Sequence, residues 1–198
     1  RLTRIEGLKD VSLTTNAICL AKNLDRIKGS GIERINISLD TLKREKFAKI
    51  TGGDCFDIVW EGIMKAHEAG FSPIKLNTVV LAGVNDDEIP ELAALSFQYP
   101  FHIRFIEYMP VGACSMSVET PLLAPEILKR IQSLGKLVPV RRNVSDGPAR
   151  RYKFKGAKGE IGLISAMSEH FCHECNRLSL TAAGNLRTCR LSDHSVDL

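Results

Sequence analysis

Apolar and polar positions along the first half of the chain follow two periods that alternate. Runs of β-branched and other apolar residues predict strands at residues 11–13, 34–39, 74–81 and 101–107. Between and after them, apolar residues recur at helical spacing and predict helices at residues 17–28, 41–50, 56–69 and 85–97. Strands that alternate with helices predict an α/β fold with a parallel sheet and right-handed crossovers. Because 198 residues are too few for an eight-fold barrel of about 250 residues, we expect a partial (β/α) barrel.

The pattern changes after Gly112. An amphipathic helix is predicted at residues 125–134, and a basic loop follows at residues 138–147. Two short strands at residues 152–155 and 161–165 flank a glycine-containing turn, which is typical of a hairpin. We therefore expect two parts. Residues 1–112 form the later strand–helix units of an incomplete barrel, and residues 113–198 form a small hairpin-containing region.

The composition is that of an ordinary globular protein, with 44% hydrophobic and 25% charged residues. A net charge of +4 fits an anionic small molecule as well as it fits nucleic acid. The sequence contains neither an apolar stretch of 18 residues nor a signal-peptide pattern, so we expect a cytoplasmic protein with no membrane span. Because the first residue is Arg1 and not methionine, we interpret the sequence as a piece of a longer protein.

Three of the six cysteines form the most informative pattern in the chain. Cys172 and Cys175 make a C-x2-C pair, and Cys189 follows at a distance. In a chain without export signals this spacing indicates metal or redox chemistry rather than a disulfide framework. The spacing alone leaves three options open: a [4Fe-4S] cluster with one open iron, a zinc ion with a histidine as fourth ligand, or redox-active thiols. The other cysteines stand alone and are typical of small buried residues: Cys19, Cys55 and Cys114.

Charged residues inside the predicted strands are the second candidate signal. Lys75, Arg104 and Glu107 are costly in a buried strand unless each is paired or faces a ligand. One interpretation is an internal ion pair between Lys75 and Glu107, and the other is a binding site for an anion. The basic pairs Arg141–Arg142 and Arg150–Arg151 fit either a solvated face or contacts to phosphate groups.

Six motifs occur in an order that resembles one enzyme family over essentially the whole chain. They are TTN (14–16), INISLD (35–40), KLNTVV (75–80), GVNDDE (83–88), RFIEYMPVG (104–112) and FCHECNR (171–177) with its distant Cys189. In this order they resemble molybdenum cofactor biosynthesis protein A, the GTP 3',8-cyclase family of radical S-adenosylmethionine (SAM) enzymes.

The resemblance implies a lyase of molybdenum cofactor biosynthesis with an incomplete (β/α) barrel. In that family an N-terminal [4Fe-4S] cluster cleaves SAM to a 5'-deoxyadenosyl radical, and a second [4Fe-4S] cluster holds the purine of GTP. The product is (8S)-3',8-cyclo-7,8-dihydroguanosine 5'-triphosphate. The resemblance also implies a downstream partner, cyclic pyranopterin monophosphate synthase. It allows a homodimer and implies no nucleic-acid or membrane partner. No catalytic residue is assigned.

The resemblance implies roles for ten residues. The second cluster is expected on Cys172, Cys175 and Cys189, and SAM on Ser38 and Met109. GTP is expected on Thr14, Lys75, Arg104, Arg177 and Ser179. The family usually reads C-x-x-C-x-R-x-R, so Ser179 replaces an arginine, and a serine lacks the charged fork of a guanidinium.

The family's N-terminal C-x3-C-x2-C loop, its Gly-Gly-Glu-Pro motif and its final glycine pair are absent from these 198 residues, so we expect this piece alone to be inactive. Two other features, Ser179 and the basic loops, leave alternative functions open. Ser179 is compatible with another radical SAM enzyme whose auxiliary cluster serves a different substrate, such as a peptide. The basic loops are compatible with a zinc-stabilised binding module for RNA or phosphorylated ligands.

Overall fold

The computed structural model describes residues 2–110, 121–141, 147–170, 172–175, 177–189 and 194–197. Its helices are η1 (Leu2–Arg4), α1 (Leu20–Gly29), α2 (Arg44–Thr51), α3 (Phe56–Glu68), η2 (Asp86–Glu88), α4 (Ile89–Gln98), α5 (Ala124–Gln132) and η3 (Cys172–Glu174). Its strands are β1 (Ser12–Thr15), β2 (Arg34–Ser38), β3 (Ile74–Val80), β4 (His102–Glu107), β5 (Leu137–Pro139), β6 (Arg150–Phe154), β7 (Glu160–Ile164), β8 (Ser179–Leu180), β9 (Asn185–Arg187) and β10 (Val196–Asp197). The predicted strands and helices are confirmed, with boundaries that differ by up to four residues.

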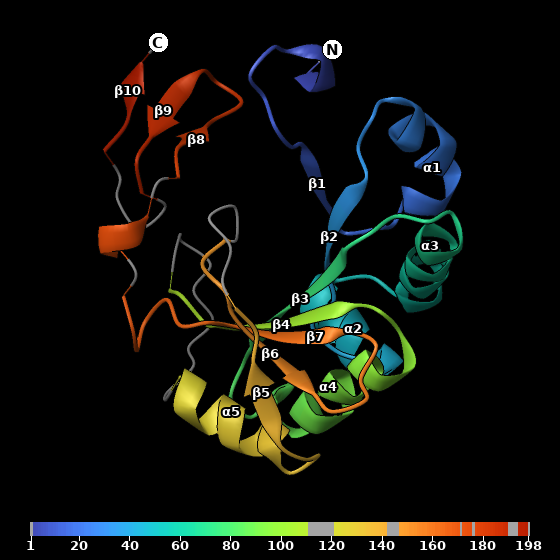
Figure 1. Ribbon diagram of the computed structural model, residues 1–198, viewed down its shortest axis with the longest axis vertical. Helices are drawn as coiled ribbons and strands as arrows, with labels where there is room; N and C mark the ends of the chain where they lie inside the picture. Colours follow the sequence, from blue (N-terminus) through green and yellow to red (C-terminus); the bar gives the residue numbers. More distant parts are fainter. Residues whose placement is uncertain are drawn as a thin grey trace.

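Seven strands of the described chain form one sheet in the order β1-β2-β3-β4-β7-β6-β5 (Figure 1). Strands β1 to β4 pair in parallel, and β7 continues the parallel part beside β4. Strands β6 and β7 form the predicted antiparallel hairpin, and β5 pairs with β6 at the edge. The hairpin is therefore an extension of the large sheet, which contains residues on both sides of Gly112. The sequence did not predict β5, whose Pro139 is compatible with a strand only at an edge.

The central strands alternate strictly between fully buried and half-buried side chains. Strand β3 has the burial order buried, half-buried, buried along its length, and β2 and β4 alternate in the same way. The buried positions share a core with apolar side chains of α1, α3, α4 and α5. Figure 1 shows these helices along the right and the bottom of the sheet. Because successive side chains in a strand point to opposite faces, the half-buried positions all lie on the face away from that core.

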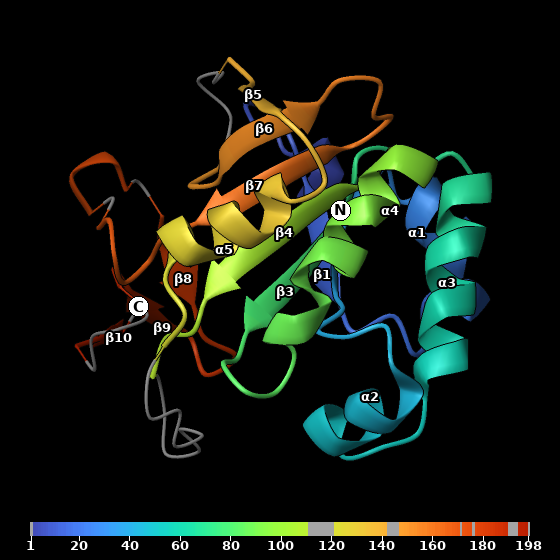
Figure 2. The same ribbon diagram turned by 90° about the horizontal axis from the view of Figure 1, so that it is seen from below.

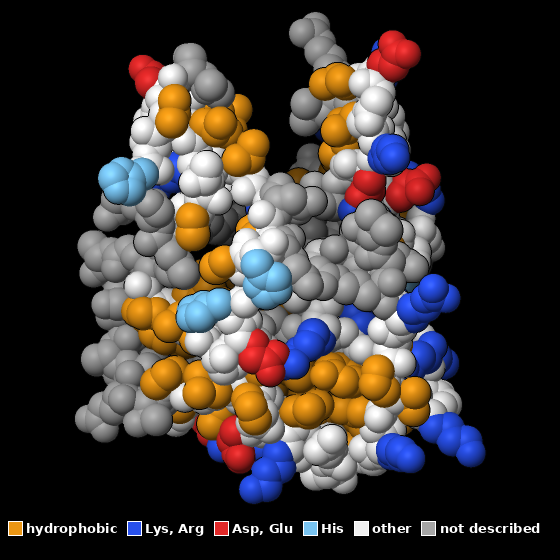
Figure 3. All heavy atoms as spheres, turned by 60° about the vertical axis from the view of Figure 1, so that its left-hand side comes forward, with side chains coloured by type: hydrophobic (Ala, Val, Ile, Leu, Met, Phe, Trp, Pro, Cys, Tyr) orange, Lys and Arg blue, Asp and Glu red, His pale blue; other side chains and the backbone are white. Residues whose placement is uncertain are grey.

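A second, three-stranded sheet has the order β10-β9-β8. Figure 2 shows the C-terminal ends of β3 and β4 pointing toward the side where this small sheet lies. One of its faces is apolar, since Leu180 pairs with Leu186 and Leu186 with Val196. Hydrophobic side chains gather over the small sheet at the upper left of Figure 3. None of the helices in the described ranges is long and apolar enough to cross a membrane.

Glu107, at the end of β4, connects three segments that are far apart in sequence. Its side chain lies on the buried face and accepts hydrogen bonds from the backbone N–H groups of Ala124 (2.6 Å), Met167 (2.7 Å) and Ser168 (2.9 Å). The hydroxyl of Ser168 donates a further bond. Burial acts to raise the pKa of Glu107, but these four hydrogen bonds outweigh it and hold the pKa below its ordinary value.

The interpretation of Lys75 and Glu107 as an internal ion pair is therefore wrong. Lys75 lies opposite His102 in the sheet register, and Glu107 lies five positions further along β4. Five is an odd number, so the two side chains point to opposite faces of the sheet. The partners of Glu107 are backbone N–H groups that start α5 and the segment leading to the cysteines.

We expect Glu107→Ala to lower the free energy of unfolding by about 3 kcal/mol, because it leaves buried N–H groups without an acceptor. Urea unfolding followed by circular dichroism measures this change, with the exposed Glu91→Ala on α4 as control. Because the pKa of Glu107 is lowered in the folded state, its contribution is present above pH of about 4.3 and is lost as the pH falls below that value. Equal stability of the two variants at pH 7 would contradict the assignment.

A candidate ligand site on the polar face of the sheet

The face of the large sheet away from the helices, here called the polar face, carries two rows of register-paired residues. Residues paired in register project to the same side of a sheet. The first row is Thr14, Asn36, Lys75, His102 and Glu160, and the second row is Ser38, Asn77, Arg104, Gly162 and Arg151. Four predicted ligand residues, two in each row, are thus brought onto one surface that crosses five or more strands.

Lys75 and Arg104 lie beside His102 on this face and make it strongly cationic. The pKa of His102 is lowered to about 4, first by burial and then by the positive charges of Lys75, Arg151 and Arg104. The carboxylate of Glu160 acts in the opposite direction, with an oxygen 3.8 Å from Nδ1 of His102. His102 is consequently neutral at pH 7, and three cations act on one half-buried position.

Arg151 is held by Glu160 through two parallel hydrogen bonds. Nε of Arg151 lies 2.7 Å from one carboxylate oxygen, and Nη2 lies 3.0 Å from the other. The two side chains are only 18% and 15% exposed. Burial acts to raise the pKa of Glu160, but the hydrogen bond with Arg151 and nearby positive charges lower it overall. Arg151 therefore does not belong to a solvated face. Of the other three residues in the two basic pairs, Arg141 and Arg150 are exposed, and Arg142 lies outside the described residues.

The second row has an open position at Gly162. A Cβ atom there would lie 3.0 Å from Cγ of Arg104 and 3.4 Å from Cβ of Ala149. The glycine thus leaves the stem of Arg104 room to lie across β7. In the same row the Oδ1 atom of Asn77 is buried and has no hydrogen-bond partner within the described chain. A buried acceptor without a partner is rare in proteins, and it fits a surface that receives polar groups from a ligand.

Thr14 and Ser38 lie in the same two rows as these cations, and Met109 follows the strand that carries Arg104. Thr14 is exposed on β1, and its hydroxyl accepts a hydrogen bond from the side-chain amide of Asn36 at 3.4 Å. Ser38 is exposed at the C-terminal end of β2, and Met109 is half-buried two residues beyond the end of β4. Both predicted SAM residues therefore lie where ligands meet parallel α/β sheets.

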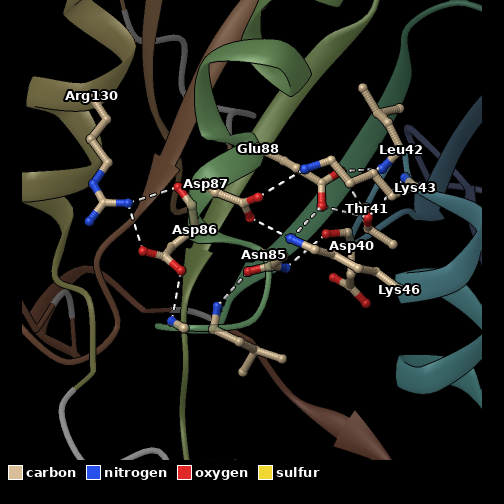
Figure 4. Close-up of polar contacts among 12 residues, drawn as sticks. Asp40, Thr41, Leu42, Lys43, Lys46, Asn85, Asp86, Asp87, Glu88 and Arg130 are labelled. Carbon is tan, nitrogen blue, oxygen red and sulfur yellow. Dashed lines mark hydrogen bonds and ion pairs between the residues drawn. The ribbon is translucent and has the colours of Figure 1, made fainter.

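The loops that follow β2 and β3 are joined by buried polar contacts (Figure 4). The backbone N–H of Val79 donates to Asp40 at 2.7 Å, and the side-chain amide of Asn85 donates to the carbonyl groups of Asp40 (2.8 Å) and Val79 (2.9 Å). Burial raises the pKa of Asp40. Asn85 is the N-cap residue of η2, but its side chain bonds these loops and forms no cap bond to the helix.

Glu88 completes this network from the GVNDDE motif. The hydroxyl of Thr41 and the backbone N–H of Leu42 donate to its carboxylate at 2.8 and 2.9 Å, and Lys46 lies 3.1 Å away. Glu88 has no exposed surface. In Figure 4, Arg130 of α5 reaches Asp86, with a distance of 2.7 Å. The motif thus fixes the loops beside Ser38, and none of these contacts needs a ligand.

The cysteine segment is exposed and carries a nearby cation. Cys172 and Cys175 lie on one turn, where the N–H of Cys175 donates to the carbonyl of Cys172 at 3.2 Å. Hydrogen bonds from the backbone and side chain of Arg177 lower the pKa of the Cys175 thiol, which favours its thiolate. Among the described residues, no three His, Cys, Asp or Glu side chains are grouped as a metal site. The structure therefore does not bring the three predicted ligands together.

The small sheet determines where Cys189 lies relative to Cys175. Ser179 of β8 lies opposite Arg187 of β9. Cys175 precedes this pair by four residues and Cys189 follows it by two, so both lie at the same end of the hairpin. The donor set of three exposed, unbridged thiols with a lowered pKa at one of them fits a thiolate-held metal group.

Comparisons with known proteins divide the chain in two. Residues 1–96 match the Radical SAM superfamily, and residues 101–198 match the family described as Molybdenum Cofactor Synthesis C. The chain is 44% identical over 200 residues to the GTP 3',8-cyclase of Pelotomaculum thermopropionicum, and 46% identical over 199 residues to that of Thermodesulfovibrio yellowstonii. Each alignment covers 100% of this chain and 62% of the relative. The chain thus spans about three fifths of the relatives' length.

Because the pKa of His102 is depressed in the folded state, protonation of its ring favours unfolding. Its ring binds a proton in the unfolded chain below pH of about 6.5 and in the folded chain only below about 4. We therefore expect the free energy of unfolding of the wild type to decrease as the pH is lowered from about 6.5 to about 4. His102 accounts for at most about 3 kcal/mol of this decrease. His102→Gln should remove that part of the pH dependence, whereas exposed His170→Gln should retain it. Unfolding curves at pH 4, 5, 6 and 7 test this, and identical pH profiles for wild type and His102→Gln would refute it.

Proposed function

Since residues 1–96 belong to the radical SAM superfamily and residues 101–198 to the Molybdenum Cofactor Synthesis C family, we propose that the protein is a GTP 3',8-cyclase of molybdenum cofactor biosynthesis. The relatives that carry this name are similar to the chain along its whole length. The reaction converts GTP to (8S)-3',8-cyclo-7,8-dihydroguanosine 5'-triphosphate. Within it, this chain supplies the GTP side of the site and part of the SAM pocket.

The observation that carries this proposal is the cationic polar face. Lys75, Arg104 and Arg151 all act on the His102 position. A triphosphate has several negative charges and is favoured by clustered cations on a half-buried surface, where attraction is stronger than in bulk water. Thr14 extends the same surface toward β1 with a hydroxyl group. An apolar or cationic substrate has no comparable reason to bind there.

The cysteine segment is proposed to hold a [4Fe-4S] cluster through Cys172, Cys175 and Cys189. When bound, such a cluster offers one iron without a protein ligand, which is available to a substrate nitrogen or oxygen. Arg177 stabilises the Cys175 thiolate that the cluster needs, and it lies beside Ser179, the other predicted GTP position. SAM is proposed to contact Ser38 and Met109, at the ends of β2 and β4.

The sheet is proposed to be the later part of a partial (β/α) barrel, with residues 1–112 as barrel units and residues 113–198 as the cluster-bearing region. The two family matches meet between residues 96 and 101, before this boundary, and they group β4 with the C-terminal part. The large sheet continues across it, so the two parts share one framework. We further propose a cytoplasmic protein, with the cyclic pyranopterin monophosphate synthase as downstream partner, and a homodimer as its assembly.

We expect this 198-residue piece not to form 5'-deoxyadenosine from SAM under dithionite, because its sequence has no C-x3-C-x2-C run for the SAM-cleaving cluster. Chromatography of an anaerobic reaction mixture measures the product. Formation of 5'-deoxyadenosine in amounts comparable to the enzyme would show that SAM is cleaved by other means.

We expect Arg104→Ala to weaken GTP binding by about 1.5–3 kcal/mol, because one charge-assisted hydrogen bond to phosphate is lost. Calorimetry on anaerobically reconstituted protein measures the affinity. The matched control is Arg44→Ala on α2, where the guanidinium pairs with Asp54 and Asp57 on the surface. Unchanged GTP affinity in Arg104→Ala would remove Arg104 from the site.

We expect anaerobic reconstitution to load about four irons per chain and Cys189→Ser to abolish that loading, because the cluster then lacks a thiolate. Iron and zinc analysis of both proteins is the measurement, with Cys19→Ser as control. One tightly held zinc and no iron in the wild type would favour a zinc-stabilised module. Iron loading without GTP affinity would favour a radical SAM enzyme for another substrate, with which Ser179 is compatible.

A further inference from the structure

Arg187 is a cation of the small sheet to which neither the sequence motifs nor the comparisons assign a role. It is the last residue of β9 and lies directly opposite Ser179, the first residue of β8. Side chains that face each other in an antiparallel pair lie on the same side, with Cβ atoms about 4.5–5.5 Å apart. The guanidinium of Arg187 and the hydroxyl of Ser179 therefore share one surface.

The Nε atom of Arg187 is buried and has no hydrogen-bond partner within the described chain. Leaving a buried guanidinium N–H without an acceptor is costly, and proteins keep such a group where something else completes it. Arg34 also has an unpartnered Nε, but its guanidinium is paired with Asp10. The Nε–H group of Arg187 is thus a buried donor that has no acceptor among the described residues.

The surroundings of Arg187 indicate what completes it. Cys189 follows it by two residues, and Arg177 lies two residues before Ser179, ahead of the facing strand β8. Arg177 in turn donates hydrogen bonds to the Cys175 thiol. Leu180, Leu186 and Val196 occupy the opposite face of the sheet. One end of this hairpin therefore combines two arginines with the predicted cluster ligands Cys175 and Cys189.

We propose that Arg187 is a substrate-binding residue that contacts the phosphate groups of the nucleotide beside the cysteine triplet, supplying across the strand pair the charge that Ser179 lacks. This inference rests on the proposed function and deepens it. A guanidinium presents its N–H groups as a fork that matches two phosphate oxygens. Because Ser179 and Arg187 are register partners, a guanidinium from either position reaches the same surface.

The test compares GTP with guanosine, which lacks phosphates, on anaerobically reconstituted full-length protein. We expect Arg187→Ala to weaken GTP binding about 10- to 100-fold and to leave guanosine binding unchanged. The double variant Ser179→Arg/Arg187→Ser, which moves the charge to the register partner, should restore GTP binding. Arg26→Ala, an exposed arginine on α1, is the matched control. Iron content and circular dichroism are recorded for every variant.

Each outcome decides the proposal. Unchanged GTP binding by Arg187→Ala overturns it, and so does an equal loss of GTP and guanosine, since a phosphate contact affects only GTP. If Arg187→Ala loses its iron, the double variant decides: retained GTP binding supports the proposal and lost binding overturns it. A wild type that loads iron but binds no GTP overturns the proposed function, and this inference with it. If the wild type binds GTP and Arg187→Ala binds it equally well, the inference about Arg187 is overturned and the proposed function is not.

Discussion

The carboxylate of Glu107 joins the two halves of the candidate site. It ends the strand that carries Arg104, and it accepts hydrogen bonds from Met167 and Ser168, which begin the segment leading to Cys172. The same carboxylate receives the first N–H of α5. Because a buried charge is tolerated only with several donors, this end of β4 has essentially one favourable arrangement. The direction in which the cysteine segment leaves the sheet follows from that arrangement.

The second constraint is the strict alternation of the central strands. Parallel strands covered on both faces usually consist of continuous hydrophobic runs, whereas β3 and β4 each place a polar or charged residue at alternate positions among their first four residues. The helices bury one face, so the polar positions are forced onto the other. Lys75, Asn77 and Arg104 then lie side by side although 29 positions separate Lys75 from Arg104 in the numbering. Their mutual repulsion is reduced locally by Glu160, and an anionic ligand would reduce it further.

Local patterns in the sequence predicted the elements well, because periodicity is a property of neighbouring residues. They failed where the outcome depends on distant partners. The membership of the β6–β7 hairpin in the large sheet depends on pairing between β4 and β7, which no local pattern encodes. Asn85 has the residue type of a helix cap, but its Oδ1 atom accepts a hydrogen bond from the backbone N–H of Leu81, and its amide group donates to the carbonyl groups of Asp40 and Val79.

The same distinction applies to the candidate site. Lys75, Arg104 and the cysteines were found from sequence because charge and thiol groups at such positions are conspicuous. His102, Glu160 and Arg151 were missed or misplaced, although a histidine and a glutamate at the starts of two predicted strands were a usable signal. Their association requires the register of β4, β7 and β6 together.

Strand register also changes how the serine at position 179 is understood. Along the chain, Ser179 reads as the loss of a cation two residues after Arg177. Across the hairpin it reads as a small side chain that stands opposite a guanidinium. Two arginines at directly opposed positions would repel each other on a half-buried surface, at a cost similar to that of other like-charge pairs. A serine facing Arg187 avoids this repulsion and leaves space beside the guanidinium. A serine at position 179 is therefore compatible with an arginine at position 187, whereas arginines at both positions would repel each other.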